Sequence, residues 1–238
     1  MLRHKDTIIL SEINSFFTSS EKAMETIFSF IRSLTFSDKR LGFPQASNLK
    51  YSNHNKLALL LLFPFFEIKT SWHYADSALY RFLSCGKDVF YRFMNDCAVD
   101  WRNLSYSLNM QLIRKVQNKS DLDNTNPRCL IIDDTDLPKT GRAIELIGKI
   151  FSHVTHTASL GFKGLFMGYH DGKSFFCLDF SLHGEKGKNQ NKPYGLTPAQ
   201  GRKRYSKKRD KSSKGNERVN DYFLTKINSM INMIRLAI

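Results

Sequence analysis

Hydrophobic residues follow a helical period through the first half of the chain. Between residues 12 and 34 they recur at three- and four-residue steps, a spacing typical of an amphipathic helix. Similar patterns predict shorter helices at residues 55–67, 72–83, 88–94 and 101–116. Residues 1–126 are therefore expected to form a helical domain.

A short glycine-containing turn at residues 84–87 (Ser-Cys-Gly-Lys) separates two of these predicted helices. Two short helices joined in this way are typical of a helix-turn-helix unit that binds DNA. The second helix would then present Lys87, Tyr91 and Arg92 to the DNA. The alternative is ordinary packing within a small helical bundle, because such bundles contain similar turns.

The pattern changes to short apolar runs after residue 127. Residues 129–132 (Cys-Leu-Ile-Ile) are followed directly by residues 133–136 (Asp-Asp-Thr-Asp), which predicts a buried strand with acidic residues at its carboxyl end. Further strands are predicted at residues 162–169 and 173–182, joined by an Asp-Gly turn, and a helix at residues 216–238. Residues 127–238 are therefore expected to form an α+β unit.

The net charge of the chain indicates which kind of partner it binds. The 238 residues include 36 Lys and Arg against 22 Asp and Glu, a net charge of +14 at pH 7. A field of this sign favours polyanions such as DNA or RNA, or an anionic membrane face. The longest apolar run, Leu57–Phe66, contains Pro64 and is much shorter than the roughly 20 residues of a bilayer span. Because the N-terminus also lacks a signal-peptide pattern, we expect a cytoplasmic protein without a membrane partner.

The positive charge is concentrated at residues 185–218. This segment holds twelve Lys or Arg against three acidic residues, together with several Gly and Pro, and is predicted to be a long basic loop. Six of its cations are suited to contact DNA phosphates, namely Arg202, Lys203, Arg204, Lys207, Lys208 and Arg209. A solvated insertion without a ligand is the alternative.

Soft metal ligands are not grouped along the chain. The four cysteines are far apart and form no Cys-x-x-Cys pair, so we expect reduced thiols rather than a zinc site or disulfides. His153 and His156 are three residues apart, but no third soft ligand accompanies them. Local structure or phosphate contacts are the expected roles of these two histidines.

The acidic strand end is the candidate for hard-metal chemistry. A carboxylate at the end of a buried strand can bind Mg²⁺, which prefers oxygen ligands. Successive strand residues point to opposite faces, so only one of Asp133 and Asp134 can face a metal, and periodicity does not decide which. Lys139 and Arg142 follow directly and could contact DNA phosphates nearby. The alternative is that these acids bind nothing.

Several segments resemble a known family. They are residues 130–142 (through Asp133 and Asp134), residues 144–149 and 151–154, residues 161–165 and 168–172, residues 180–187, and residues 87–94 with 100–102. Together they resemble the DDE, RNase H-like transposases of the group named after insertion sequence four, over roughly residues 70–238. The resemblance implies that Asp134 is a catalytic residue and a metal ligand, with Asp133 beside it, and that the chain from residue 127 is a partial RNase H-like β-β-β-α unit.

In that family a second Asp ends a fourth strand, and a Glu lies on a later helix. The sequence ends before either position, which implies a truncated transposase. The complete enzyme would use Mg²⁺ for DNA cleavage and strand transfer in DNA transposition, a form of DNA recombination. We expect this chain to bind double-stranded DNA at transposon ends without completing that reaction. A homo-oligomer is compatible with this interpretation. An unpaired sheet edge would also favour self-association.

Two alternatives from other classes stay open at this point. The chain could be a stand-alone DNA-binding regulator of transposition, whose DNA binding would not depend on Asp134. It could also be an active nuclease that uses Asp134 with Asp133 or Asp136, which predicts nicking of DNA that depends on Mg²⁺.

Overall fold

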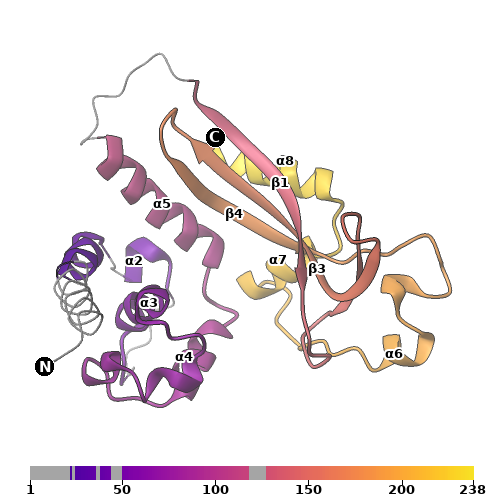
Figure 1. Cartoon of the computed structure of the whole chain (residues 1–238), viewed down its shortest axis with the longest axis horizontal. Coiled ribbons are helices and arrows are strands. Elements are labelled where there is room, and N and C mark those ends of the chain that lie inside the picture. Colours follow the sequence, from indigo (N-terminus) through magenta and orange to yellow (C-terminus); the bar gives the residue numbers. More distant parts are fainter. Residues whose placement is uncertain (1–21, 23–24, 36–37, 44–49, 118–126) are drawn as a thin grey trace, which may run out of the picture. The chain divides into compact units, whose positions relative to one another are not determined.

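The computed structural model of the chain describes residues 22, 25–35, 38–43, 50–117 and 127–238. These residues form a mixed α+β structure (Figure 1), so the predicted α+β class is confirmed. The chain divides into two compact units, Met1–Arg40 with Asn48–Phe90 and Leu41–Ser47 with Tyr91–Ile238. The sequence predicts a domain boundary after residue 126, whereas the boundary between the two compact units lies after Phe90. The reason is that α5 (Trp101–Gln117) packs on the sheet of the second unit.

The first unit is helical and contains a cluster of buried aromatic rings. The ring centroids of Tyr74 and Phe90 are 4.6 Å apart, and those of Phe63 and Phe90 are 5.2 Å apart. Residues 25–33 are helical, and the predicted helix before residue 22 lies outside the described residues. The next helical elements in the chain are α2 (Asp38–Leu41), α3 (Asn53–Leu62) and η1 (Phe63–Phe66). In the described segments of the chain, no helix is long and apolar enough to cross a membrane.

Residues 72–83 do not form the predicted helix but two 3₁₀ turns, η2 (Ser71–Tyr74) and η3 (Ala78–Arg81). The Ser77 hydroxyl donates to the Tyr74 carbonyl at 2.7 Å, and the Tyr74 hydroxyl donates to the carbonyls of Leu79 and Leu83 at 3.1 and 2.7 Å. Such side-chain bonds to the backbone compete with helix formation. The following helix, α4 (Lys87–Met94), forms as predicted. Because the first helix of the pair is missing, the predicted helix-turn-helix unit is wrong.

The second unit contains a four-stranded antiparallel sheet centred on β3. Gly161 of β3 pairs with residues of both β1 and β2, and Lys163 pairs with residues of both β1 and β4. β1 therefore lies along one edge of β3, while β2 and β4 follow one another along its other edge. The strands are β1 (Cys129–Pro138), β2 (Gly148–Ser152), β3 (Thr157–His170) and β4 (Phe175–His183).

The observed strands differ from the predicted ones in length and number. β1 continues to Pro138, so residues 133–136 lie within the strand rather than at its end, because β3 extends far enough to pair with them. β2 was not predicted. The turn between β3 and β4 does form at the predicted Asp-Gly pair, where the Asp171 carboxylate accepts the backbone N–H groups of Lys173 and Ser174 at 2.9 and 2.6 Å.

One face of the sheet is covered by α5 and by α8 (Lys226–Ala237), as Figure 1 shows. Ile113 of α5 and Met233 of α8 belong to one buried cluster with Leu165 and Met167 of β3. The predicted C-terminal helix is divided into α7 (Lys214–Asp221) and α8. The division occurs because the Thr225 hydroxyl caps α8, accepting the N–H of the third helical residue at 3.2 Å.

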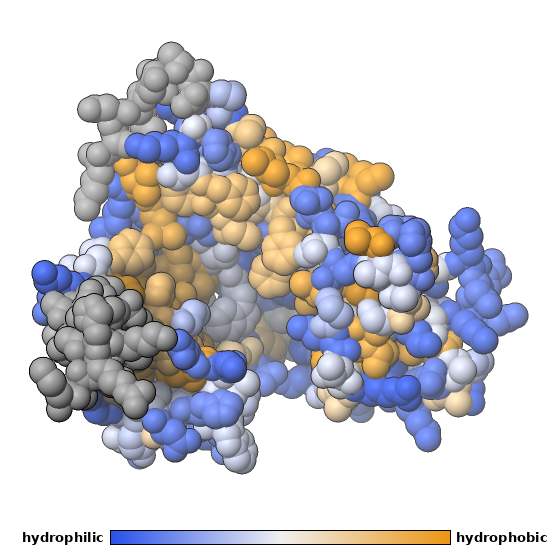
Figure 2. Space-filling view, in the orientation of Figure 1, coloured by the Kyte–Doolittle hydropathy of each residue, from blue (hydrophilic) through white to orange (hydrophobic). Residues whose placement is uncertain are grey.

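The basic segment 185–218 is more ordered than the predicted loop. It contains η4 (Pro193–Gly195), α6 (Pro198–Arg202) and the start of α7. An ion pair between Arg209 and Glu145 ties it to the chain between β1 and β2. Figure 2 shows hydrophilic side chains around α6 and hydrophobic ones over the sheet strands.

Candidate functional site

Asp134 lies within β1, on the face of the sheet that α8 covers. Its partner on β3 is Leu165, a member of the buried core, and Ile132 on the same face of β1 packs against that core. Asp133 belongs to the opposite face, because strand residues alternate. Its carboxylate accepts the backbone N–H of Asp134 at 2.8 Å. The alternation therefore places Asp134, and not Asp133, beside α8.

The carboxylates of Asp134 and Asp136 each have a lysine partner. Lys226, the first residue of α8, forms an ion pair with Asp134. The Lys163 ammonium lies 2.5 Å from Asp136 and donates to the carbonyl of Phe151 at 2.7 Å. The hydrogen bond from Lys163 holds the pKa of Asp136 below its ordinary value. Both carboxylates are thus neutralised by cations of the chain itself.

A cavity of about 550 Å³ opens beside Asp134. It lies between the end of β4, the start of α8 and the turn between β2 and β3. Acidic, basic and aromatic side chains line it together, among them Asp134, Lys163, His183, Glu185, Tyr222 and Lys226.

His183 is the buried imidazole of this cavity, with 3% of its surface exposed. Its Nδ1 lies 3.2 Å from the Leu224 carbonyl, and its Nε2 lies 2.7 Å from the Ser181 hydroxyl. Because a carbonyl only accepts, we assign the proton to Nδ1 and let Nε2 accept from Ser181. Burial lowers the pKa of His183. His183 is therefore a neutral link between β4 and the turn before α8.

The described residues can be compared with what a magnesium site requires. Mg²⁺ is commonly held by one or two carboxylates together with substrate phosphates and water. Asp134 offers one carboxylate, which Lys226 already contacts. In the part of the chain that the structure describes, no three His, Cys, Asp or Glu side chains come together as a metal site would require. His153 lines the cavity and His156 does not, and both lie in a turn rather than a helix.

Several of the predicted DNA-contacting residues are held by contacts within the chain. The Lys87 ammonium lies 3.1 Å from the centroid of the Trp72 ring, and Lys207 donates to the Asn95 carbonyl at 3.2 Å. Arg92 also has a partner in the chain, while Tyr91 is partly exposed. Two arginines are anchored as well, Arg204 by the carbonyls of Leu146 and Ile147 and Arg209 by Glu145. The contacts of Lys87, Lys207, Arg204 and Arg209 give these four side chains structural roles.

The remaining predicted cations are free to meet a ligand. They are exposed, and within the described ranges none of them lies within ion-pair distance of a carboxylate: Lys139, Arg142, Arg202, Lys203 and Lys208. All five belong to the unit that carries Asp134.

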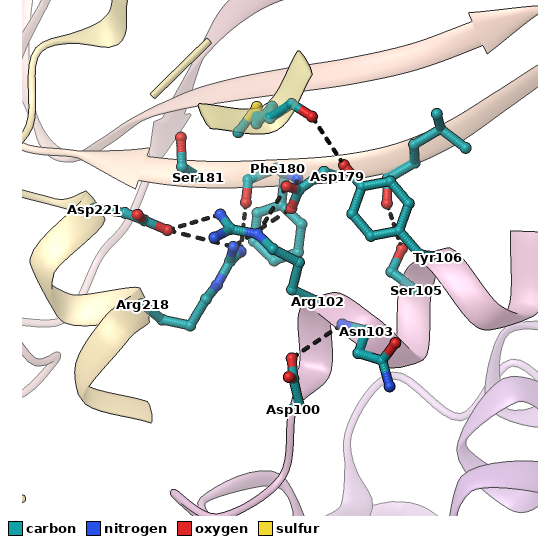
Figure 3. A network of polar contacts seen from close by, with 12 residues as sticks. Asp100, Arg102, Asn103, Ser105, Tyr106, Asp179, Phe180, Ser181, Arg218 and Asp221 are labelled. Atoms are coloured by element: carbon teal, nitrogen blue, oxygen red, sulfur yellow. Dashed lines mark hydrogen bonds and ion pairs between the residues drawn. The ribbon is translucent and has the colours of Figure 1, made fainter. Parts of the chain in front are cut away.

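A buried ion network, shown in Figure 3, supports the framework of this unit. Arg102 of α5 lies 2.8 Å from Asp179 of β4 and 2.8 Å from Asp221 of α7, and Arg218 lies 3.4 Å from both carboxylates. The Asp179 side chain is 1% exposed, and burial raises its pKa. Two charges of each sign balance one another, so the network joins three elements and leaves no charge for a ligand.

Comparisons with known proteins identify no family. No protein-family model, curated protein or solved structure matches this chain. The interpretation of the site therefore depends on its own residues.

The sequence pattern missed Lys163, His183 and Lys226 as members of this site. Lys163 meets Asp136 only through the register of β1 on β3, which no local pattern specifies. Lys226 could have been placed beside a helix start, because Thr225 has the chemistry of an N-terminal cap. Its pairing with Asp134 depends on packing and has no signal in the sequence.

Proposed function

We propose that this chain binds DNA at the ends of an insertion sequence, as part of a DDE transposase. The observation that carries the proposal is the set of five exposed cations without acidic partners on the unit that holds Asp134. Unpaired cations on one unit provide the sequence-independent contacts that bind a phosphate backbone. The concentration of positive charge in residues 185–218 supports the same partner.

The order of the elements supports the proposed RNase H-like unit. β1, β3 and β4 are neighbours in an antiparallel sheet, and α8 follows them and covers one face. Asp134 lies on the first of these strands, on the side of the helix. An RNase H-like catalytic domain would begin in this way, with a metal-binding carboxylate on its first strand.

In the complete enzyme, Asp134 would be one of the ligands of Mg²⁺. When bound, the ion supplies positive charge at the attacking and leaving oxygens of a phosphodiester. The residues of this chain bind and orient the DNA backbone, and Lys226 holds the Asp134 carboxylate in place. Phosphoryl transfer of this kind uses two metal ions, and Asp134 is a single carboxylate, so we expect no strand transfer by this chain alone.

The proposal is tested by measuring duplex affinity by fluorescence anisotropy at a series of salt concentrations. The logarithm of the affinity should fall linearly with the logarithm of the salt concentration. Asp134→Ala should not weaken binding, and plasmid DNA should remain unnicked in Mg²⁺ or Mn²⁺. An affinity that does not respond to salt would overturn DNA binding. Nicking that Asp134→Ala abolishes would instead support the nuclease alternative.

A stand-alone regulator of transposition is the second candidate. It is favoured by the pairing of Asp134 with Lys226 and by the lack of a grouped metal site among the described residues. The coding sequence downstream of codon 238 distinguishes the two. A strand that ends in Asp and a later helical Glu, in the same or a shifted frame, would support the transposase, and their absence would support the regulator.

A further inference from the structure

A second, smaller cavity lies away from Asp134 in the same unit. Its volume is about 190 Å³. Ile147, Leu160 and Leu196 form its apolar part. Its charged lining residues are Arg142, Lys149, Lys203 and Arg204, and no acidic residue lines it. We call it the basic cavity.

Three of these cations have no acidic partner. Arg142, Lys149 and Lys203 are exposed, and within the described residues none lies within ion-pair distance of a carboxylate. Arg209, by contrast, is paired with Glu145. Like charges gathered around one opening create a positive field that favours an anionic ligand.

The fourth cation, Arg204, belongs to the wall of the cavity. Its Nε donates to the Ile147 carbonyl at 2.9 Å, and its guanidinium lies 4.3 Å from the centroid of the Tyr194 ring. It also contacts the Tyr222 hydroxyl. Because these contacts fix Arg204, one side of the cavity is preorganised.

The stem of Lys149 lies close to Gly195. Gly195 has a positive φ of 64° and lies so close to Lys149 that a Cβ at this position would be 2.8 Å from the lysine Cβ. Glycine is therefore required there by its backbone conformation and by this close approach. The stem of Lys149 therefore lies directly against the backbone of η4 beside the cavity.

The size of the cavity limits the ligand. The cavity volume is larger than the roughly 30 Å³ that one water molecule occupies in the liquid. It is smaller than the volume of common small-molecule sites, which begins at ~300 Å³. A single tetrahedral anion fits these limits better than a whole nucleotide.

We propose that the basic cavity binds one backbone phosphate of nucleic acid, through Arg142, Lys149 and Lys203. This inference rests on the proposed DNA binding and adds a defined contact point to it. Several cations that share one phosphate act together. Their removal should therefore cost one phosphate contact, and not three.

The test compares two triple variants by anisotropy with a 30-base-pair duplex. One is R142A/K149A/K203A, and the matched control is R114A/K173A/R235A, which removes three exposed cations of the same unit that lie outside residues 185–218. We expect the cavity variant to lower the salt slope by about one, which corresponds to roughly eightfold weaker binding at 0.1 M salt. The control should change both quantities less than half as much. Replacing chloride by inorganic phosphate at constant ionic strength should weaken the wild type more than the cavity variant.

The outcomes separate the two proposals. If the wild type binds no duplex, the proposed function fails and this inference fails with it. If the wild type binds and the two triple variants lose affinity equally, DNA binding stands and the phosphate site is overturned. A fall of about three in the slope would also overturn it, because the cations would then contact separate phosphates. Circular dichroism of both variants verifies that they are folded.

Discussion

The outer edges of β4 and β1 differ in the contacts that their backbone groups make. Along β4, the Ser105 hydroxyl donates to the Leu178 carbonyl at 2.7 Å, and the Asn109 amide donates to the Cys177 carbonyl at 2.8 Å. Arg218 contacts a further carbonyl of the same strand. Along β1, no strand in the described part of the chain pairs with the outer edge. One edge is closed by side chains and the other is open.

The difference shows where another strand could be added to the sheet. An edge with unpaired backbone groups is a template for pairing, and Ile131 on β1 is 43% exposed. The side chains that close β4 come from α5 and α7, so this protection exists only in the folded unit. The open edge of β1 agrees with the proposed RNase H-like unit, in which a further strand would lie beside Asp134.

The largest expected effect comes from the ion network behind β4. Asp179→Asn removes the buried carboxylate that faces Arg102 and Arg218. Breaking a buried ion pair from one side typically costs about 3–5 kcal/mol of unfolding free energy. Urea denaturation followed by circular dichroism measures the loss. Asp76→Asn, at an exposed position, is the control, and its unfolding free energy should stay within about 0.5 kcal/mol of wild type. If Asp179→Asn lowers the unfolding free energy by less than about 1 kcal/mol, the network is not important for stability.

The same network illustrates what sequence patterns can and cannot predict. The turn at Asp171 and the helix α5 follow from local chemistry and from apolar period, and both were predicted. Arg102 and Asp221 are 119 residues apart in the sequence, so their contact depends on the packed fold. The pairing of Lys226 with Asp134 likewise depends on packing. The apolar period alone left Asp133 and Asp134 as equal candidates, and only the family resemblance favoured Asp134. The helix predicted at residues 72–83 was wrong for a local reason. Hydrogen bonds between side chains and backbone around Tyr74 outweigh the helical pattern of apolar residues.

A smaller effect is expected from the side chains that close the edge of β4. Ser105→Ala and Asn109→Ala each remove a hydrogen bond to a strand carbonyl, worth about 1 kcal/mol apiece. Asn103→Ala is a matched control on the same helix, and its side chain is exposed. If the double variant is as stable as the control by urea denaturation, these bonds do not protect the edge.

The pH dependence of stability tests the link at the end of β4. Burial lowers the pKa of His183 in the folded state below the ordinary value of 6.5. At a pH just below 6.5, the imidazole is therefore protonated in the unfolded chain and still neutral in the folded chain. Stability should therefore fall as the pH drops from 7 towards 5. The charged groups near the ring are Asp134, Asp221 and Lys226.

His183→Gln should flatten this part of the stability profile, because the amide does not titrate. The exposed His73→Gln is the control and should leave the slope as in the wild type. Chemical denaturation at five pH values between 5 and 7 measures both variants. An unchanged slope in His183→Gln would assign the pH dependence to other groups. The carboxylates with lowered pKa, such as Asp136, act at more acidic pH.

The smallest change in stability is expected at the open edge itself. Ile131→Lys adds a charge to the exposed face of β1 and should alter the unfolding free energy by no more than about 0.5 kcal/mol. It should nevertheless reduce self-association, because a charged edge strand resists pairing with another chain. Val154→Lys adds the same charge at a turn residue that is 90% exposed, so it separates the effect of the edge from that of net charge. Sedimentation velocity at increasing protein concentration compares the three proteins. If both lysine variants associate like the wild type, the open edge of β1 is not what brings copies of the chain together.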